Sequence, residues 1–272
     1  MKNVSLKDVQ KVQYELLKEV DKICAKHNIK YFLVAGTTLG AVRHDGFIPW
    51  DDDLDIGMAR DDYEKFKEIM THNFFDEMFF QDSNTDINYG NIFGKVRKTN
   101  TIYTENAAKN SRAKNGVYID IFCFDNAPDE FIKRYYQKYS IYIYKRLLLL
   151  KNNYSLLKDE DSFYKKIICA FLKIITKFLS RKALVKRIDR ISKKYNVNNT
   201  LNKVNLGGAY TYEKELIPSY YLSKIELHKF EDALFPIFEN FDLYLTNLYG
   251  NYMEPTPLNK RENRHGIIEI KL

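Results

Sequence analysis

Apolar side chains recur at intervals of three and four residues in three parts of the chain, and this spacing predicts helices. The first helix is predicted over residues 5–27, because Ser5 and Asp8 form the sequence pattern of a capping box. The second is predicted over about residues 61–71, with acidic side chains in the first turn, where the helix dipole favours them. Residues 128–195 are predicted to be mostly helical, and they are strongly basic.

Shorter apolar or alternating runs predict strands. Residues 29–35 are typical of a buried strand, and the small residues at 36–40 predict a turn directly after it. From residue 79 to residue 125 the pattern predicts several short strands separated by polar turns, with Asp125 ending the last one. Residues 225–232 alternate as a strand, and the following Phe235-Pro236 predicts the start of a last helix.

The composition is that of a globular protein. The chain has 272 residues, of which 45% are hydrophobic and 15% aromatic, so it can bury a full core as one large domain, with or without a helical appendage. The cysteines at positions 24, 123 and 169 are far apart in the sequence and show no zinc-binding spacing, so we expect reduced thiols. No signal-like apolar segment occurs, and no run approaches the roughly 18 apolar residues of a spanning helix. These features predict a cytoplasmic protein.

Charge is distributed unevenly along the chain. The formal net charge is +7, yet acidic residues concentrate around 51–62 while lysine and arginine crowd the middle of the sequence. Such asymmetry indicates an anionic partner, which on charge alone could be a nucleotide, an anionic glycan precursor, a membrane surface or a nucleic acid.

The aspartates that follow the small-residue turn are the strongest candidates for chemistry. On a strand, Asp53 and Asp55 share one face while Leu54 and Ile56 face the core, which places the two carboxylates roughly 7 Å apart. Two carboxylates at this spacing suit one or two Mg²⁺ ions with phosphate oxygens completing the coordination. The alternative is a polar loop whose acids cap the helix that begins near Asp61.

Three further polar residues interrupt apolar strands. Asp120 lies among apolar neighbours, where an ionised carboxylate must bind metal or pair with a buried cation. Lys95 and Arg97 alternate with apolar residues and therefore share one face of a strand. That face either contacts two phosphates or is simply solvated.

These residues also carry a resemblance. The pattern Gly36, Leu39-Gly40, Arg43 and Ile48 to Ile56 resembles the signature of the LicD family of phosphocholine transferases, which includes the fukutin-related proteins and belongs to the nucleotidyltransferase superfamily. The block Phe235-Pro236 with Leu248 to Met253 resembles the end of that family's fold. One departure is Thr37, where the wider superfamily has Ser or Gly.

The resemblance implies an α+β fold, with a nucleotidyltransferase-type mixed sheet flanked by helices and a mostly helical basic insertion. We expect a catalytic core at 1–127, the insertion at 128–205, and a C-terminal part at 206–272 that completes the catalytic domain. The site residues it implies are the metal ligands Asp53, Asp55 and Asp120, the general base Asp120 or Asp51, and the substrate-binding residues Gly36, Thr37, Thr38, Arg43, Lys95 and Arg97.

The activity implied by the resemblance is transfer of phosphocholine, or a related phospho-alcohol, from CDP-choline or a similar CDP-alcohol to a sugar hydroxyl. The acceptor would be a cell-surface glycan such as a teichoic acid, lipopolysaccharide or capsule precursor, and it could be lipid-linked. Mg²⁺ is the expected cofactor, with Mn²⁺ as the alternative ion, and no nucleic-acid partner is expected. Two other hypotheses are a nucleotidyltransferase that moves a nucleotide from an NTP to a small molecule, protein or RNA, and a non-enzymatic protein that binds membrane surfaces.

Residues 163–179 form the most apolar helical segment, and all of its charged residues are lysines. One hypothesis is a helix that lies on an anionic membrane at the inner membrane face. The other is a helix packed against the core with a lysine-rich outer side. Residues 147–150 are all leucine, too few to span a bilayer, and are expected in the core.

Overall fold

The structure is a computed structural model that describes residues 4–73, 75–157, 162–257, 261 and 266–272. Its α-helices are α1 (Leu6–Lys26), α2 (Ala35–His44), α3 (Arg60–His72), α4 (Phe131–Lys151), α5 (Phe163–Phe178), α6 (Arg181–Lys193) and α7 (Phe241–Tyr249). Its strands are β1 (Phe32–Leu33), β2 (Asp55–Ala59), β3 (Met78–Gln81), β4 (Gly94–Lys98), β5 (Ile102–Glu105), β6 (Tyr118–Ala127), β7 (Asn202–Asn205), β8 (Leu216–Pro218), β9 (Ile225–Phe230), β10 (Ala233–Phe238) and β11 (Ile267–Lys271). Short 3₁₀ helices lie at Asn106–Ala108 and Ser219–Ser223.

The long strand β6 organises the central sheet. The sheet has the order β1-β2-β6-β4-β3, and β2 runs parallel to β6 while the other pairs are antiparallel. Strand β4 pairs with the first half of β6, and β7, which also pairs with β8, takes the last residues of β6. This mixed sheet flanked by helices confirms the α+β class expected from the sequence.

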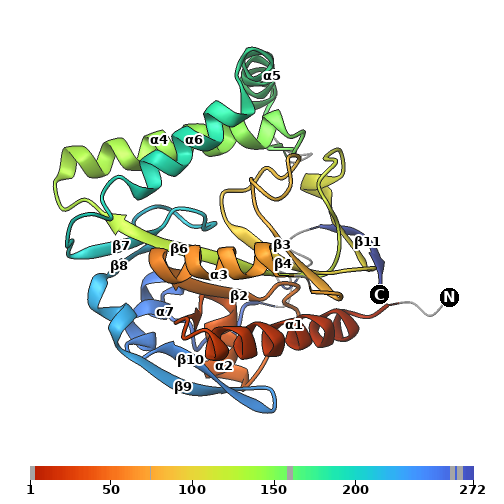
Figure 1. Ribbon diagram of the computed structural model, residues 1–272, viewed down its shortest axis with the longest axis vertical. Helices are drawn as coiled ribbons and strands as arrows, with labels where there is room; N and C mark the ends of the chain where they lie inside the picture. Colours follow the sequence, from red (N-terminus) through yellow and green to blue (C-terminus); the bar gives the residue numbers. More distant parts are fainter. Residues whose placement is uncertain (1–3, 74, 158–161, 258–260, 262–265) are drawn as a thin grey trace.

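Helices α1 and α3 lie against one face of the sheet (Figure 1). Side chains that alternate along β2 and β6, such as Ile56 and Ile121, are fully buried there with Leu17 of α1 and Phe66 of α3. The capping box predicted for α1 is present, because the Asp8 amide donates to the Ser5 hydroxyl and the Ser5 amide donates to the Asp8 carboxylate. Local sequence and burial therefore agree on where α1 begins.

The last third of the chain packs beside β1 and contributes to the apolar clusters on both sides of the sheet. Strands β9 and β10 form an antiparallel hairpin, and α7 packs with them on a second apolar cluster that contains Phe122 and Phe124 of β6. Strand β11 pairs with β5. Near the start of α1, Val9 packs in one apolar cluster with Ile267 and Ile270 of β11.

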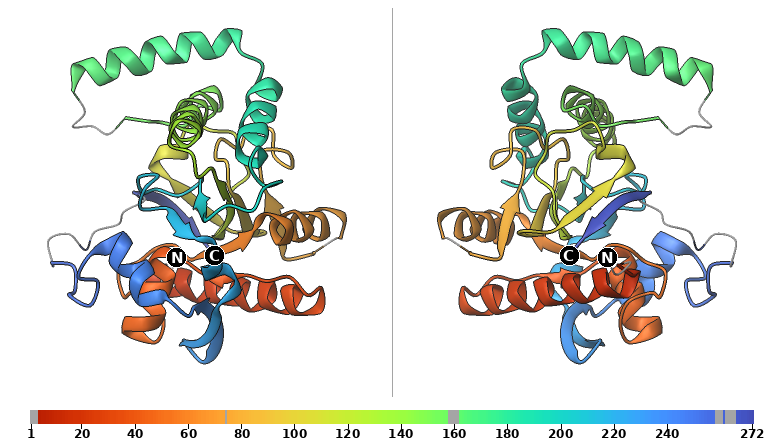
Figure 2. Two further views of the ribbon diagram at one scale, coloured as in Figure 1. Left: turned by 90° about the vertical axis from the view of Figure 1, so that its left-hand side faces the viewer. Right: turned by 90° about the vertical axis from the view of Figure 1, so that its right-hand side faces the viewer.

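Helices α4, α5 and α6 gather at one end of the molecule (Figures 1 and 2). Leu147 and Leu148 of α4 are buried with Leu184 and Ile188 of α6, which confirms that the leucine run belongs to a core. Helix α5 lies furthest from the sheet, beyond α4 and α6.

Four local predictions are wrong. The small residues 36–40 lie in α2 instead of a turn, and the strand before them shrinks to β1; a Cβ on Gly40 would lie 2.4 Å from the Gly46 carbonyl oxygen, so its small size serves backbone packing. Asp125 does not end β6, because the strand continues to Ala127 by pairing with β7; its carboxylate pairs with Arg60 of α3. Phe235-Pro236 lies in β10, where a two-stranded hairpin tolerates a residue without an N–H, and the helix begins at Phe241.

Candidate functional site

Three charged side chains form a row across the centre of the sheet. Asp55 of β2 is the register partner of Asp120 of β6, and Asp120 is in turn the partner of Lys95 of β4. Residues at the same register on neighbouring strands point to the same face and lie about 5 Å apart. Strand pairing, and not proximity in the sequence, therefore brings these three residues together.

A cavity of about 430 Å³ opens on this face. Asp53, Asp55, Asp120 and Lys95 line it, as the sequence predicts for one shared site. The predicted alternation also holds, since Leu54 and Ile56 are fully buried in the core on the other side. The alternative in which these acids only cap α3 is wrong for Asp55, which lies within β2.

The loop before β2 adds more carboxylates to the cavity. Asp51 lines it together with Asp53, and one carboxylate oxygen from each of Asp51, Asp52 and Asp53 lies within 4.8 Å of the others. Gly36 forms the adjacent wall, and a Cβ at this position would come within 2.7 Å of the Asp51 Oδ2. A glycine at position 36 thus leaves room for the Asp51 carboxylate beside the first turn of α2.

Lys95 is held between two acids. Its Nζ lies 2.9 Å from the Asp120 Oδ1 and 3.3 Å from the Glu105 Oε1, and it sits 3.1 Å from the centre of the Tyr118 ring. Burial raises the pKa of the Asp120 carboxyl, and the Lys95 ammonium opposes that rise. Asp120 therefore pairs with a buried cation, which was one of the two alternatives stated for it, and it also lines the cavity.

Asp55 is the least compensated acid of the row. Its side chain is buried, and its Oδ1 has no hydrogen-bond partner among the described residues. Burial and the nearby charges of Asp53 and Asp120 raise the pKa of the Asp55 carboxyl well above its ordinary value. A divalent cation would supply the missing partner, and carboxylate oxygens are the ligands that Mg²⁺ prefers, so these residues fit the expected ion.

The two threonines of the predicted phosphate-binding turn have structural contacts. The Thr37 hydroxyl accepts a hydrogen bond from the Asp55 backbone amide at 2.8 Å, and the Thr38 hydroxyl donates to the Leu33 carbonyl oxygen at 2.7 Å. Both side chains are buried. The contact of Thr37 fixes the backbone at the start of β2, and it thereby positions Asp55 without touching its carboxylate.

Arg97 shares a strand face with Lys95 but does not reach the cavity. Its guanidinium is buried, and it donates to the Gln81 side chain and, at 2.6 Å, to the Gly116 carbonyl oxygen. Among the described residues it is not part of the cavity lining, whereas Lys95 is. The structure therefore separates two residues that the sequence treats as a pair.

Arg43 lies beside a second, smaller cavity of about 140 Å³. Its guanidinium donates to the Tyr252 carbonyl oxygen at 2.6 Å, which ties α2 to the segment after α7. Asp51 lines both cavities, and of these two we call the 430 Å³ cavity on the sheet the larger cavity and this one the smaller cavity. The Asp51 carboxylate consequently marks the place where the two cavities share a wall.

Several residues that line the larger cavity escaped the sequence analysis. Lys145 of α4 donates to the Gly207 and Gly208 carbonyl oxygens at 2.8 and 2.9 Å, and burial lowers its pKa to about 8. Burial raises the pKa of Glu215 to about 7, and a Cβ on Gly208 would collide with this carboxylate. The adjacent glycines 207 and 208 were the available signal, whereas Lys145 is one of several basic residues along α4. Three tyrosines, Tyr210, Tyr244 and Tyr249, complete this wall.

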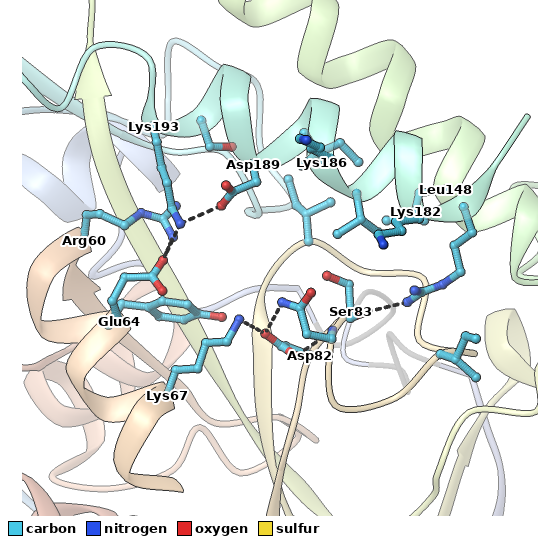
Figure 3. A pocket seen from close by; sticks show the side chains of 18 residues that line it. Arg60, Glu64, Lys67, Asp82, Ser83, Leu148, Lys182, Lys186, Asp189 and Lys193 are labelled. Atoms are coloured by element: carbon cyan, nitrogen blue, oxygen red, sulfur yellow. Dashed lines mark hydrogen bonds and ion pairs between the residues drawn. The ribbon is translucent and has the colours of Figure 1, made fainter. Parts of the chain in front are cut away.

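A different cavity, of about 580 Å³, lies between α3 and α6 (Figure 3). Lys67 pairs with Asp82, and Lys193 pairs with Glu64 at 2.9 Å and with Asp189 at 2.7 Å. These cations already have acidic partners from the surrounding elements. The pair between Lys193 and Glu64 joins α6 to α3, so we assign a structural role to the charged side chains of this cavity.

Comparison with known proteins gives a consistent result. Residues 28–150 match the family model described as LicD/FKTN/FKRP, nucleotidyltransferase domain. The chain is 28% identical to the lipopolysaccharide cholinephosphotransferase LicD of Haemophilus influenzae, over 97% of this chain and 97% of that protein. It is also 34% identical to the uncharacterized protein RP689 of Rickettsia prowazekii, over 43% of this chain and 41% of that protein. The resemblance stated from sequence motifs is confirmed.

Proposed function

We propose that this chain, whose residues 28–150 form a nucleotidyltransferase domain of the LicD family, transfers phosphocholine or a related phospho-alcohol from a CDP-activated donor to a sugar hydroxyl of a cell-surface glycan. One observation carries the proposal: the row of Asp55, Asp120 and Lys95 opens into a cavity large enough for a nucleotide. The similarity to a lipopolysaccharide cholinephosphotransferase, which extends over nearly the whole chain, supports the choice of phosphocholine and of a glycan acceptor.

Asp53, Asp55 and Asp120 would hold Mg²⁺, or Mn²⁺ as the alternative, at the cavity floor. The ion would neutralise the diphosphate and stabilise the charge that develops during in-line displacement. The partnerless Oδ1 of Asp55 supports this assignment, because a buried carboxylate oxygen without a donor is costly in the metal-free chain.

In the transfer step, the acceptor oxygen attacks the phosphorus that bears choline, and the bond from that phosphorus to the bridging oxygen breaks. CMP leaves with the bridging oxygen, and the hydroxyl proton passes to a carboxylate. The sequence favours Asp120 as this base, but two observations support Asp51. Asp120 is held by Lys95, and Asp51 lies between the larger cavity and the smaller one, where a sugar can approach.

Lys95 would orient Asp120 and Glu105 and present positive charge to the donor phosphates. Its ammonium is fixed from three sides, by the two carboxylates and by the Tyr118 ring. A cation that is already positioned loses little side-chain entropy when phosphate binds. Because the donor is a water-soluble nucleotide, we place the reaction in the cytoplasm.

The second candidate is a transferase that moves a whole nucleotide from an NTP, because the matching family model is itself a nucleotidyltransferase domain. The two reactions differ in their product. Transfer of phosphocholine releases CMP, whereas nucleotide transfer releases pyrophosphate.

The experiment is incubation of the purified chain with Mg²⁺, a glycan acceptor and a panel of CDP-choline, CDP-ethanolamine, CDP-glycerol and the four NTPs. We expect CMP from a CDP-alcohol and no pyrophosphate, and Asp55→Asn should abolish the CMP. Pyrophosphate from an NTP, with no CMP from any CDP-alcohol, would refute phospho-alcohol transfer and favour the second candidate.

A further inference from the structure

Helix α5 turns its apolar side outward. Large apolar side chains that are 50% to 86% exposed form this surface, which we call the α5 outer face: Phe163, Tyr164, Ile167, Ile168, Phe171, Ile174 and Phe178. At about 100° per residue they fall within one continuous arc of the helix. The opposite side carries Leu172, which is half-buried, and Thr176, which is 3% exposed, so α5 rests on the protein by its less apolar side. The packing hypothesis stated from the sequence is wrong for this helix.

The charges on α5 are arranged around that face. Lys166, Lys173 and Lys177 project from one side of the apolar arc, and residues 163–178 contain no acidic residue. No ion pair involves these three lysines within the part of the chain that the structure describes. An apolar face bordered by lysines is complementary to a surface that is apolar inside and negatively charged at its boundary.

Helix α4 extends the same kind of surface. Its exposed side chains form a second stripe, with Phe131, Ile132, Tyr135, Tyr139, Tyr142 and Ile143 between 41% and 81% exposed. Helix α4 packs against α5, and both lie at the end of the molecule away from the β9–β10 hairpin (Figures 1 and 2). Tyrosines are typical of the boundary between a bilayer and water, because the ring is apolar and the hydroxyl is polar.

We infer that the α5 outer face docks on an anionic lipid bilayer, with the helix lying in the plane of the headgroups. None of the helices within the described residues is long and apolar enough to cross a membrane, so the face lies on the bilayer without spanning it. A second copy of the chain fits the face less well. Two identical α5 faces brought together by a twofold axis would place six lysines in one interface with no acid from α5 to offset them.

This inference is independent of the proposed transfer reaction, because the α5 outer face contains no residue of the larger cavity. Membrane docking would affect the reaction by bringing the enzyme close to its acceptor. An acceptor anchored in the bilayer would be confined to a thin layer beside the enzyme, whereas the CDP-activated donor would arrive from solution.

The test is sedimentation of the full chain with phosphatidylcholine vesicles, with and without phosphatidylglycerol, over a range of salt concentrations. We expect binding only to the anionic vesicles, weakening with salt. The triple change Lys166→Gln, Lys173→Gln and Lys177→Gln should lower the partition coefficient roughly a hundredfold, at about fivefold for each lysine. The double change Phe171→Ser and Ile174→Ser should lower it by at least about tenfold.

The matched control is Leu227→Ser with Leu234→Ser, two leucines on the β9–β10 hairpin that are 65% and 59% exposed. This variant should bind vesicles as the unmodified chain does, and circular dichroism should show the same fold for all variants. Equal pelleting with neutral and anionic vesicles would overturn the inference. So would a dimer in light scattering that Phe171→Ser with Ile174→Ser converts to a monomer, since the occupant of the face would then be a second copy.

Discussion

Charged side chains are usually exposed and large apolar side chains usually buried, and two regions of this molecule depart from that rule in opposite ways: the larger cavity and the α5 outer face. In the cavity, charged groups such as Asp55, Asp120 and Lys95 are withdrawn from water, while on α5 seven large apolar side chains are exposed to it. Each arrangement costs free energy in the isolated chain. Both costs would be offset by contact with something outside the polypeptide, which we propose is an ion with a phosphorylated substrate in one case and a lipid surface in the other.

The largest expected effect comes from removing one negative charge from the larger cavity. Asp55→Asn should lower the turnover number by at least about a thousandfold, because the neutral amide cannot hold a cation against the diphosphate. The fold should keep its thermal stability or gain some, since repulsion among Asp53, Asp55 and Asp120 is relieved. Steady-state kinetics and calorimetry measure both effects. Asp61→Asn, an exposed aspartate in the first turn of α3, is the control and should leave turnover unchanged. Near-normal turnover in Asp55→Asn would show that the metal assignment is wrong.

A second experiment separates the two basic residues of β4. Lys95→Met should lower kcat/KM for the donor by about tenfold to a hundredfold, because a charge-assisted contact worth about 1.5–3 kcal/mol is lost. Arg97→Met should act on stability instead, costing about 1–3 kcal/mol, since it leaves the Gln81 and Gly116 acceptors without a donor. Equal effects of both variants on donor KM would contradict the geometry described here.

A third prediction concerns pH. The folded-state pKa of Glu215 is about 7, above its ordinary 4.5, so the folded chain keeps this proton over a range where the unfolded chain has lost it. This group therefore favours the folded state below about pH 4.5, and its contribution declines as the pH rises to 7, by on the order of 1–3 kcal/mol. Urea unfolding measures this dependence, and in Glu215→Gln the free energy of unfolding should lack this decline between about pH 4.5 and 7. Glu213→Gln, an exposed neighbour, is the control and should retain it. Identical pH profiles for Glu215→Gln and the unmodified chain would exclude Glu215 as the source.

The smallest expected effect is on stability, and it comes from substitutions on the α5 outer face. Phe171→Ser with Ile174→Ser should change the free energy of unfolding by less than about 0.5 kcal/mol per residue, because neither side chain is buried. Phe66→Ala, on the buried side of α3, should cost about 3–5 kcal/mol. Chemical denaturation measures both values. A loss of several kcal/mol from the α5 variant would mean that its outer face packs against protein in solution.

Local signals predicted much of this fold, and long-range pairing decided the rest. The capping box of α1, the acidic first turn of α3 and the alternation of Asp53 to Ile56 were readable because each depends on neighbours a few residues away. The capture of Arg97 by Gln81 and Gly116 was not readable, since both acceptors come from other strands and their connections.

The same reason explains the wall of the larger cavity that the sequence analysis missed. Lys145, Gly208 and Glu215 lie on separate elements, and the middle of the chain carries no motif that relates them to the aspartates. The outward face of α5 was also undecided by sequence. An amphipathic period gives the existence of an apolar side but not the direction in which it points.

The pairing of β11 with β5 has a consequence for how the chain matures on the ribosome. Glu105, the second acid beside Lys95, stands at the end of β5, and its register partner is Ile267 of β11. Strand β11 follows every other described strand in the sequence, so β5 gains its partner only after residues 267–271 have left the ribosome. An isolated strand of four residues is not stable by itself. We therefore expect Glu105 to be fixed beside Lys95 later in synthesis than Asp120, because β6 leaves the ribosome before β11.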